Sequence, residues 1–242
     1  MADSTVCIVT TCNRPDALAR SLPQIVALGA PVLVVDDGSP DELALDLANH
    51  HGAACLRLPH NRGLACALNV GLSYWLADTA VEWISVFQDD VDVRPDCLEV
   101  LARIAATGTA PIMTGHDAAE HAPDGADEVA SMLAGILVRK KRNSRATHMH
   151  GRRDYWQAVM PIPTRALGAP KRTSDDPDVR GLGSNVDFWI YRDCPESVVA
   201  RGGHVLCVPG LVRTFLWEGK DSTWNNTQRA GADPELRGAT PG

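Results

Sequence analysis

Apolar residues follow two different spacings in the first hundred positions. Four short and nearly continuous apolar runs, which predict strands buried on both faces, occupy residues 5–10, 31–35, 53–58 and 82–88. Apolar positions at helical spacing predict helices that begin at or near Pro15, Asp41, Leu64 and the residue after Pro95. Pro23 interrupts the first of these helices, so we expect a bend or an early stop there.

This alternation of strands and helices predicts an α/β fold with right-handed crossovers and a mostly parallel central sheet. The loops at residues 10–16, 36–41 and 88–94 would then leave the sheet at the same edge. Ligands of open α/β sheets bind at that edge, beyond the carboxyl ends of the strands. The pattern therefore predicts a ligand site built from these three loops.

The chemistry of these loops is acidic. Asp89, Asp90 and Asp92 follow the fourth apolar run, and Asp36 and Asp37 follow the second. Clustered carboxylates repel one another, and Mg²⁺ or Mn²⁺ relieves this repulsion because it takes oxygen ligands and bridges them to substrate phosphates. On these residues alone, a solvated acidic turn that caps the next helix is an equally open interpretation.

Composition narrows the class of protein. The 242 residues, 45% hydrophobic and 22% charged, are typical of a globular protein with a substantial core. We expect no transmembrane span and no signal peptide, because no apolar stretch approaches about 18 residues and no basic segment precedes an apolar one at the N-terminus. Seven scattered cysteines without a Cys-x-x-Cys pair indicate reduced thiols, and we expect a cytoplasmic protein.

The net charge and the distribution of basic residues bear on the possible binding partners. A net charge of −7 argues against a surface that coats nucleic acid. Residues 139–153 are basic, however, and we interpret them as a solvated face, with peripheral contact to lipid headgroups or to an anionic acceptor such as nucleic acid left open. The first strand is followed neither by Gly-x-Gly-x-x-Gly nor by a phosphate loop, which makes an ordinary dinucleotide site improbable.

Four short motifs in order resemble glycosyltransferase family 2, whose members have the glycosyltransferase A-type (GT-A) fold. They are Thr-Cys-Asn-Arg-Pro at 11–15, Val-Asp-Asp-Gly-Ser at 35–39, Asn-Arg-Gly at 61–63 with Asn-Val-Gly at 69–71, and Gln-Asp-Asp-Val-Asp at 88–92 with Pro-Asp at 95–96. The resemblance implies a three-layer α/β/α fold of the nucleotide-diphospho-sugar transferase type. It also implies a nucleoside diphosphate sugar as the donor and a hydroxyl-bearing molecule as the acceptor.

By this resemblance, Thr10 or Thr11 and Asp36 contact the base and ribose, and Asp37 supports that loop. Asp90 holds Mg²⁺ or Mn²⁺ on the diphosphate, aided by Asp89 or Asp92. The other residues that the resemblance assigns to the donor are Asn13, Arg14, Asn61, Gly63 and Asn69.

The second half departs from the family pattern. Members carry Glu-Asp-x-Asp before an apolar helix, whereas here Asn185 stands where the base is expected and Asp187 is the remaining acid. Asp187 is our candidate for the general base, with Asp175, Asp176 or a retaining reaction as alternatives. The histidine that often completes the metal shell is missing, so Glu218 or Asp221 is a candidate ligand and Lys220 a candidate partner of the diphosphate.

The sequence thus predicts a metal-assisted, inverting glycosyltransferase acting on a glycan or a lipid-linked sugar. A non-catalytic sugar-nucleotide or glycan-binding module and a nucleotidyltransferase are the alternatives. We expect residues 1–114 to form the nucleotide-sugar-binding half, residues 115–228 the acceptor-binding half of the same domain, and residues 229–242 a flexible tail. Gly, Pro and basic residues in 115–180 predict long loops there.

Overall fold

The computed structural model describes residues 4–117, 129–164 and 186–215. Its strands are β1 (Thr5–Thr11), β2 (Val32–Asp36), β3 (Ala54–Arg57), β4 (Trp83–Gln88), β5 (Val91–Val93), β6 (Ile112–His116), β7 (Val129–Leu133), β8 (Ile136–Lys141), β9 (His148–Arg152) and β10 (Val205–Thr214). Its helices are α1 (Pro15–Val26), α2 (Leu43–His50), α3 (Leu64–Leu76), α4 (Cys97–Ala105), α5 (Arg153–Val159) and α6 (Val186–Phe188), which continues into a π-helical turn at Trp189–Asp193.

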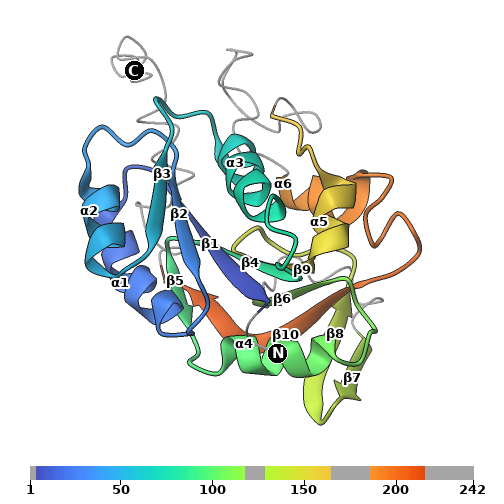
Figure 1. The fold of residues 1–242 in the computed structure, drawn as a ribbon. Helices are drawn as coiled ribbons and strands as arrows, with labels where there is room; N and C mark the ends of the chain where they lie inside the picture. Colours follow the sequence, from blue (N-terminus) through green and yellow to red (C-terminus); the bar gives the residue numbers. More distant parts are fainter. Residues whose placement is uncertain (1–3, 118–128, 165–185, 216–242) are drawn as a thin grey trace, which may run out of the picture.

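The described strands form one sheet in the order β3-β2-β1-β4-β9-β6-β10-β8-β7, and β5 pairs with β10 (Figure 1). β3, β2, β1 and β4 are parallel neighbours, as the sequence predicted. The register places Thr11 beside Asp36, and Thr10 beside Gln88. The loops after β1, β2 and β4 therefore do leave the sheet at one edge.

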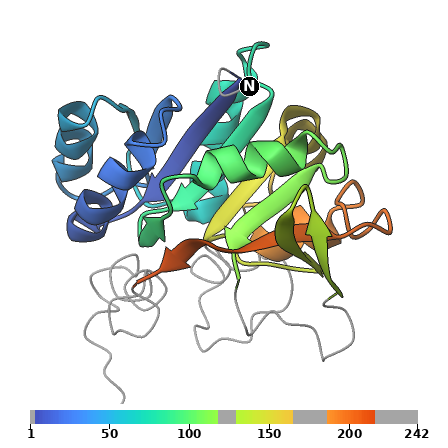
Figure 2. The same cartoon turned by 90° about the horizontal axis from the view of Figure 1, so that it is seen from below.

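Helices cover both faces of the sheet, which confirms the predicted three-layer α/β/α fold. One core contains apolar residues of α3, α5 and the π-helical turn, packed on one side of β1, β2 and β4. The other core contains those of α1, α2 and α4, packed on the opposite side. In Figure 2, the view from below, α4 runs in front of the strands, and α1 and α2 lie together at the left of the picture. Successive residues of β1, such as Cys7 and Ile8, are fully buried in different cores.

The sequence predicted long loops in 115–180, whereas residues 129–159 consist mostly of strands and a helix. This part forms the β7–β8 hairpin, then β9, then α5. β9 lies between β4 and β6 and is antiparallel to both. Its sequence, His-Met-His-Gly-Arg, does not look like a buried strand because two of its core-facing side chains are histidines. The sheet accommodates His148 because Ser85 and the backbone of Gly115 hydrogen-bond its ring, and the ring of His150 stacks on Trp83.

Several smaller predictions can be compared with the structure. Helix α1 includes Pro23 and ends three residues later, at Val26. All seven cysteines are in the described ranges, and each is a free thiol. Within these ranges no helix combines the length and the apolar character that a membrane crossing requires. The expected boundary at residue 114 falls inside β6, which pairs with β9 and β10 of the second half.

Candidate functional site

Four buried carboxyl groups lie at the sheet edge that the sequence indicated. Asp36 ends β2 and Asp37 follows it, and Asp89 and Asp90 follow β4. Their exposed fractions are 0%, 4%, 2% and 7% respectively. A buried carboxylate is costly unless it is paired or hydrogen-bonded, so the partners of each group show what it does.

Asp36 is held entirely by protein groups. One oxygen accepts hydrogen bonds from the Ser39 backbone N–H (3.0 Å) and hydroxyl (2.5 Å), and the other accepts from Arg57 Nε (3.0 Å). Arg57 ends β3 and also donates to the carbonyl of Ser39 at 2.8 Å. The structure thus places Asp36 beneath the turn at Gly38 and Ser39, which it holds in shape. Its predicted contact with the nucleoside stays a prediction.

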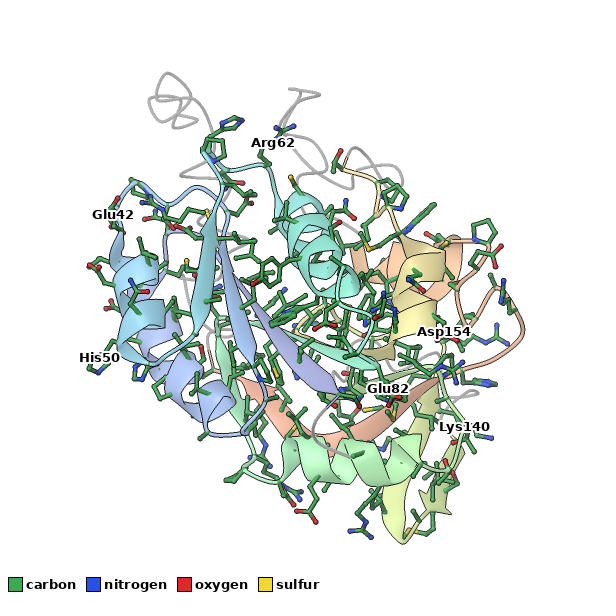
Figure 3. The ribbon with its side chains drawn as sticks, viewed as in Figure 1. Glu42, His50, Arg62, Glu82, Lys140 and Asp154 are labelled. Atoms are coloured by element: carbon green, nitrogen blue, oxygen red, sulfur yellow. The ribbon has the colours of Figure 1, made fainter. Side chains whose placement is uncertain are left out.

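Asp37 joins the second loop to the loop before α3. Its two oxygens accept from the backbone N–H groups of Arg62 (2.8 Å) and Gly63 (2.7 Å). Burial raises the pKa of Asp37, and these two N–H groups lower it. The loops approach so closely at Gly38 (φ +74°) that a Cβ atom there would lie 2.2 Å from the backbone carbon of His60. Arg62, labelled in Figure 3, lies on this loop between β3 and α3.

The loop after β1 is bonded to both of these loops. Cys12 Sγ donates to the carbonyl of Asp37 (3.2 Å) and accepts from Asn61 Nδ2 (3.3 Å). The backbone N–H of Asn13 donates to the Ser39 hydroxyl at 2.8 Å. Asn13 itself has a positive φ of 53°. The structure therefore brings together, from three segments, the predicted donor residues Thr10, Thr11, Asn13, Asp36, Asp37, Asn61 and Gly63.

Asn69 lies apart from these contacts. It is on α3, and its side-chain amide makes two hydrogen bonds with the backbone of Ile162, at 2.7 and 2.8 Å. These bonds tie α3 to the segment after α5. A role of Asn69 in the donor pocket stays a prediction.

Asp89 has a partner for each oxygen. Oδ2 accepts from the Thr11 hydroxyl (2.7 Å), and Oδ1 lies 3.0 Å from Arg14 Nη1. Burial raises the pKa of Asp89 to about 7, against the lowering effect of the Arg14 guanidinium. Asp89 therefore anchors the first loop to the end of β4.

Asp90 differs from the other three acids. Oδ2 lies 3.1 Å from Arg14 Nη2, but Oδ1 is buried and has no hydrogen-bond partner among the described residues. The backbone carbonyl of Asp90 accepts from the N–H of Phe215 (3.1 Å), at the end of β10. An unused, buried carboxylate oxygen is the kind of ligand that Mg²⁺ and Mn²⁺ take, so Asp90 fits the predicted metal.

Asp92, the second predicted metal ligand, is occupied elsewhere. Its oxygens accept from Arg20 Nε (3.0 Å) and Nη2 (2.5 Å) and from Gln24 Nε2 (3.2 Å), all on α1. Within the described ranges, no three His, Cys, Asp or Glu side chains are close enough to share one ion. Among the four buried acids Asp90 is thus the one with an oxygen to spare, and phosphates and water would supply most ligands of a bound Mg²⁺.

The general-base candidate, Asp187, lies on α6 and is half-buried. Burial lowers the pKa of Arg145, and the negative charge of Asp187 opposes this effect. Burial raises the pKa of Tyr191, and Asp187 adds to that rise. Asp90 acts on Arg145 in the same way, so one guanidinium lies within electrostatic range of both carboxylates. The predicted residues Lys220, Glu218, Asp221, Asn185, Asp175 and Asp176, like the tail 229–242, lie outside the described residues.

Sequence reasoning missed Arg57 and Arg145. Arg57 could have been found as a basic residue at the end of the third predicted strand, at the same sheet edge as Asp36. Arg145 was treated as part of a solvated basic face, yet it is half-buried two residues before Thr147, whose carbonyl accepts from the N–H of Gln88 (3.0 Å). This backbone bond places the segment beside the end of β4.

The basic segment 139–153 is not one continuous exposed surface. Lys141 is fully buried and pairs with Asp117, as does Arg139 (2.6 Å). Arg152 pairs with Asp154, and Arg153 donates to main-chain carbonyls at the end of α3 and beyond it. Figure 3 shows Lys140 on β8 and Asp154 at the start of α5, on separate elements. Lys141 therefore serves the interior, and Arg139, Arg152 and Arg153 are paired with nearby groups of the protein.

Comparison with known proteins gives the site a context. The sequence profile of the family described as "Glycosyl transferase family 2" matches residues 6–168. No curated protein matches the sequence. Among solved structures, S. aureus TarS matches with a TM-score of 0.54 and 14% identity, over 86% of this chain and 35% of that one.

S. aureus TarS 1-349 in complex with UDP matches with a TM-score of 0.53 and 14% identity, over 85% of this chain and 60% of that one. At such identities the likeness shows a shared fold. The chain therefore spans about a third to three fifths of the TarS chains that it resembles.

Proposed function

The chain belongs to glycosyl transferase family 2, and from this membership we propose that it transfers a sugar from a uridine diphosphate sugar to a hydroxyl group of an acceptor. Uridine is our choice of nucleoside because S. aureus TarS 1-349, crystallised in complex with UDP, has the same fold. The acceptor that we propose is a glycan or a lipid-linked sugar, as the family resemblance implies.

The observation that carries this proposal is the buried, unused oxygen of Asp90 at the meeting point of three bonded loops. Those loops contain the backbone of residues 11–13, 37–39 and 61–63, joined through Cys12, Ser39 and Asp37. They offer a fixed surface for a nucleoside at the carboxyl end of parallel strands, where α/β folds bind ligands. With the nucleoside bound to this surface, its diphosphate would lie next to Asp90.

Positive charge close to Asp90 supports the same assignment. Mg²⁺ or Mn²⁺ bound there would neutralise the negative charge that grows on the departing diphosphate. Arg14 pairs with Asp90, and Arg145 lies within its electrostatic range. These two guanidinium groups would add donors that match phosphate oxygens.

Asp187 is the proposed general base. This assignment is supported by the Arg145 guanidinium, which lies within electrostatic range of both Asp187 and Asp90. A carboxylate in this place would accept the proton of the acceptor hydroxyl as that oxygen attacks the sugar. Direct attack of this kind inverts the configuration of the sugar.

The contacts that Lys141, Arg139, Arg152 and Arg153 make with other groups of the protein favour a glycan or lipid-linked acceptor over nucleic acid. A nucleic-acid surface needs several basic side chains turned together toward solvent. Here these four side chains bind carboxylates and main-chain carbonyls of the protein itself.

Two variants test the proposal. Asp90→Asn should abolish the enhancement of UDP binding by Mn²⁺, which we expect to be at least about tenfold, or 1.4 kcal/mol, in the wild type. Asp187→Asn should keep UDP binding but lower turnover by about a hundredfold or more. Isothermal titration with UDP, with and without Mn²⁺, and a UDP-sugar hydrolysis and transfer assay measure these effects. Asp96→Asn, in an exposed pair with Arg94, is the control and should change neither.

The outcomes separate the alternatives. Absence of any UDP binding by the wild type would contradict the proposal. Tight, Mn²⁺-dependent UDP binding without hydrolysis or transfer to any acceptor would favour a non-catalytic sugar-nucleotide-binding module. Full turnover by Asp187→Asn would refute the assignment of the base.

A further inference from the structure

Arg14 connects the two carboxyl groups that follow β4. Its Nη1 lies 3.0 Å from Asp89 Oδ1, and its Nη2 lies 3.1 Å from Asp90 Oδ2. All three side chains are less than one-tenth exposed. One guanidinium therefore uses its two terminal nitrogens on two adjacent acids, one nitrogen for each.

The position of Arg14 is fixed by the sequence around it. It immediately precedes Pro15, the first residue of α1, and the Arg14 carbonyl accepts the N–H of Leu18 at 3.1 Å. Thr11, three residues earlier, donates to the other oxygen of Asp89. The loop between β1 and α1 thus carries both partners of Asp89, and it sets the distance from Arg14 to Asp90.

Within the trio of Arg14, Asp89 and Asp90 the charge is only partly neutralised, because two ionised carboxylates face one guanidinium, and the open acceptor is Asp90 Oδ1. Arg145 adds positive charge within electrostatic range of Asp90. A divalent cation that came to Asp90 in the absence of nucleotide would meet the positive charge of Arg14 within a few ångströms, in a site shielded from water. Repulsion between like charges is strong in such surroundings.

A bound diphosphate changes this balance. It brings further negative charge and oxygen ligands for the cation, and it gives Arg14 an alternative partner that suits a guanidinium. The cation and Arg14 would then no longer compete for the same two carboxylates.

We propose that Arg14 keeps the metal affinity of the Asp89–Asp90 pair low, so that the cation binds together with the nucleotide rather than before it. This inference rests on the proposed function, since it assumes that Asp90 holds the metal. It makes Arg14 a positioning residue that acts through Asp89 and Asp90. An arginine that only stabilised the fold would leave metal binding unchanged.

Binding of Mn²⁺, followed by the loss of the electron paramagnetic resonance signal of the free ion, tests this proposal at pH 8. We expect UDP to tighten Mn²⁺ binding by the wild type at least tenfold. Arg14→Met should bind Mn²⁺ without UDP at least tenfold more tightly than the wild type, and UDP should then add less. Arg94→Met, which removes the partner of the exposed Asp96, is the matched control and should behave as the wild type does.

Arg14→Lys keeps the proposal testable if Arg14→Met does not fold. A lysine is shorter and has one charged nitrogen, so it cannot span both carboxylates and should free Asp90 Oδ2. We expect this variant to bind Mn²⁺ without UDP at least threefold more tightly than the wild type. Circular dichroism and the unfolding temperature establish that each variant is folded.

Folded Arg14 variants with unchanged or weaker Mn²⁺ binding in the absence of UDP would overturn this inference and leave the proposed function intact. A UDP-saturated wild type that takes up no Mn²⁺ would instead contradict both.

Discussion

At the scale of single residues, the number of protein partners distinguishes the four buried acids. Asp36, Asp37 and Asp89 each have both oxygens engaged by protein groups, and they fix the shape of the loops. Asp90 keeps one buried oxygen unused among the described residues. This difference separates three acids that build the site from the one that is suited to a ligand.

The pair of Arg57 and Asp36 should be important for stability. Arg57→Met leaves the fully buried Asp36 with Ser39 as its remaining partner among the contacts seen here, and we expect a loss of about 1.5–3 kcal/mol in the free energy of unfolding. Arg57 is 27% exposed, which keeps the expected loss below that of a fully buried pair. Urea unfolding measures the change.

Arg94→Met is the control for this prediction, because it breaks a pair whose side chains are 50% and 43% exposed. It should cost less than about 1 kcal/mol. Equal losses in the two variants would contradict the role assigned to Asp36.

Sequence alone identified the acids but not their partners. Asp36, Asp37, Asp89 and Asp90 were recognisable because each follows an apolar run at one sheet edge. Arg57 is 21 positions from Asp36 in the chain, and Arg14 is 75 positions from Asp89. Such pairs depend on how the strands are ordered, which the spacing of apolar residues does not fix.

At the scale of elements, close contact between loops makes the site rigid. The loop after β2 and the loop before α3 meet at Gly38, where a Cβ atom would collide with the backbone of His60. The same loops are joined by the two hydrogen bonds of Asp37. A substitution that separates them should therefore affect both stability and nucleotide binding.

Gly38→Ala tests this contact against a matched glycine. Gly29 has a similar φ of +80° but has nothing within 4 Å of a Cβ atom. Gly29→Ala should cost only the strain of a positive φ, about 1–2 kcal/mol. Gly38→Ala should cost about 2–4 kcal/mol and also weaken UDP binding, because overpacking adds to that strain. Thermal unfolding and UDP titration measure the two effects, and equal behaviour of the two variants would refute the close contact.

The buried strand β9 should make the protein sensitive to acid. Burial lowers the pKa of His150 to about 3, and it lowers the pKa of His148 well below its usual value. His148 Nδ1 accepts from the N–H of Gly115 (2.8 Å), so the proton of the neutral ring is on Nε2, which faces Ser85. A second proton on Nδ1 would oppose that N–H group.

These lowered pKa values determine the direction in which the stability of the fold changes with pH. The unfolded chain takes up protons on these histidines below about pH 6.5 while the folded chain does not, so stability is lost as the pH falls from there toward 3. Each histidine contributes about 1.4 kcal/mol per pH unit in the steep part of this range.

Between pH 6 and pH 4, His150→Phe should reduce the pH dependence of the free energy of unfolding by about 1.4 kcal/mol per pH unit, the contribution of one histidine. The phenyl ring can keep the stack on Trp83, whose ring centroid lies 4.9 Å from that of His150. Urea unfolding at several pH values measures the slope, and an unchanged slope would show that His150 is not buried in its neutral form.

At the scale of the whole molecule, one sheet runs through both halves of the sequence. From β1 to β4 strands and helices alternate, and the sequence predicted these four strands, the helices between them and their common edge, but not β5 or β6. β9 enters this sheet between β4 and β6, and β10 pairs with β5, β6 and β8. The second half was harder to predict because its strands are polar or antiparallel, and each is stabilised by partners distant in the chain.

This continuity has a consequence for the site. Asp90 is hydrogen-bonded through its backbone to Phe215 at the end of β10, and Gln88 to Thr147 before β9. Residues of the second half thus contact the segment that contains Asp89 and Asp90. Asp187 and Arg145 belong to this second half and are the residues from it that we connect with Asp90.

A crystal structure of the protein with UDP and Mn²⁺ tests the central claim most directly. Our account predicts an anomalous manganese peak about 2.0–2.3 Å from an oxygen of Asp90, bonded also to the diphosphate, with the nucleoside against the loops at 11–13, 37–39 and 61–63. A manganese peak away from Asp90, or UDP bound away from this sheet edge, would contradict it.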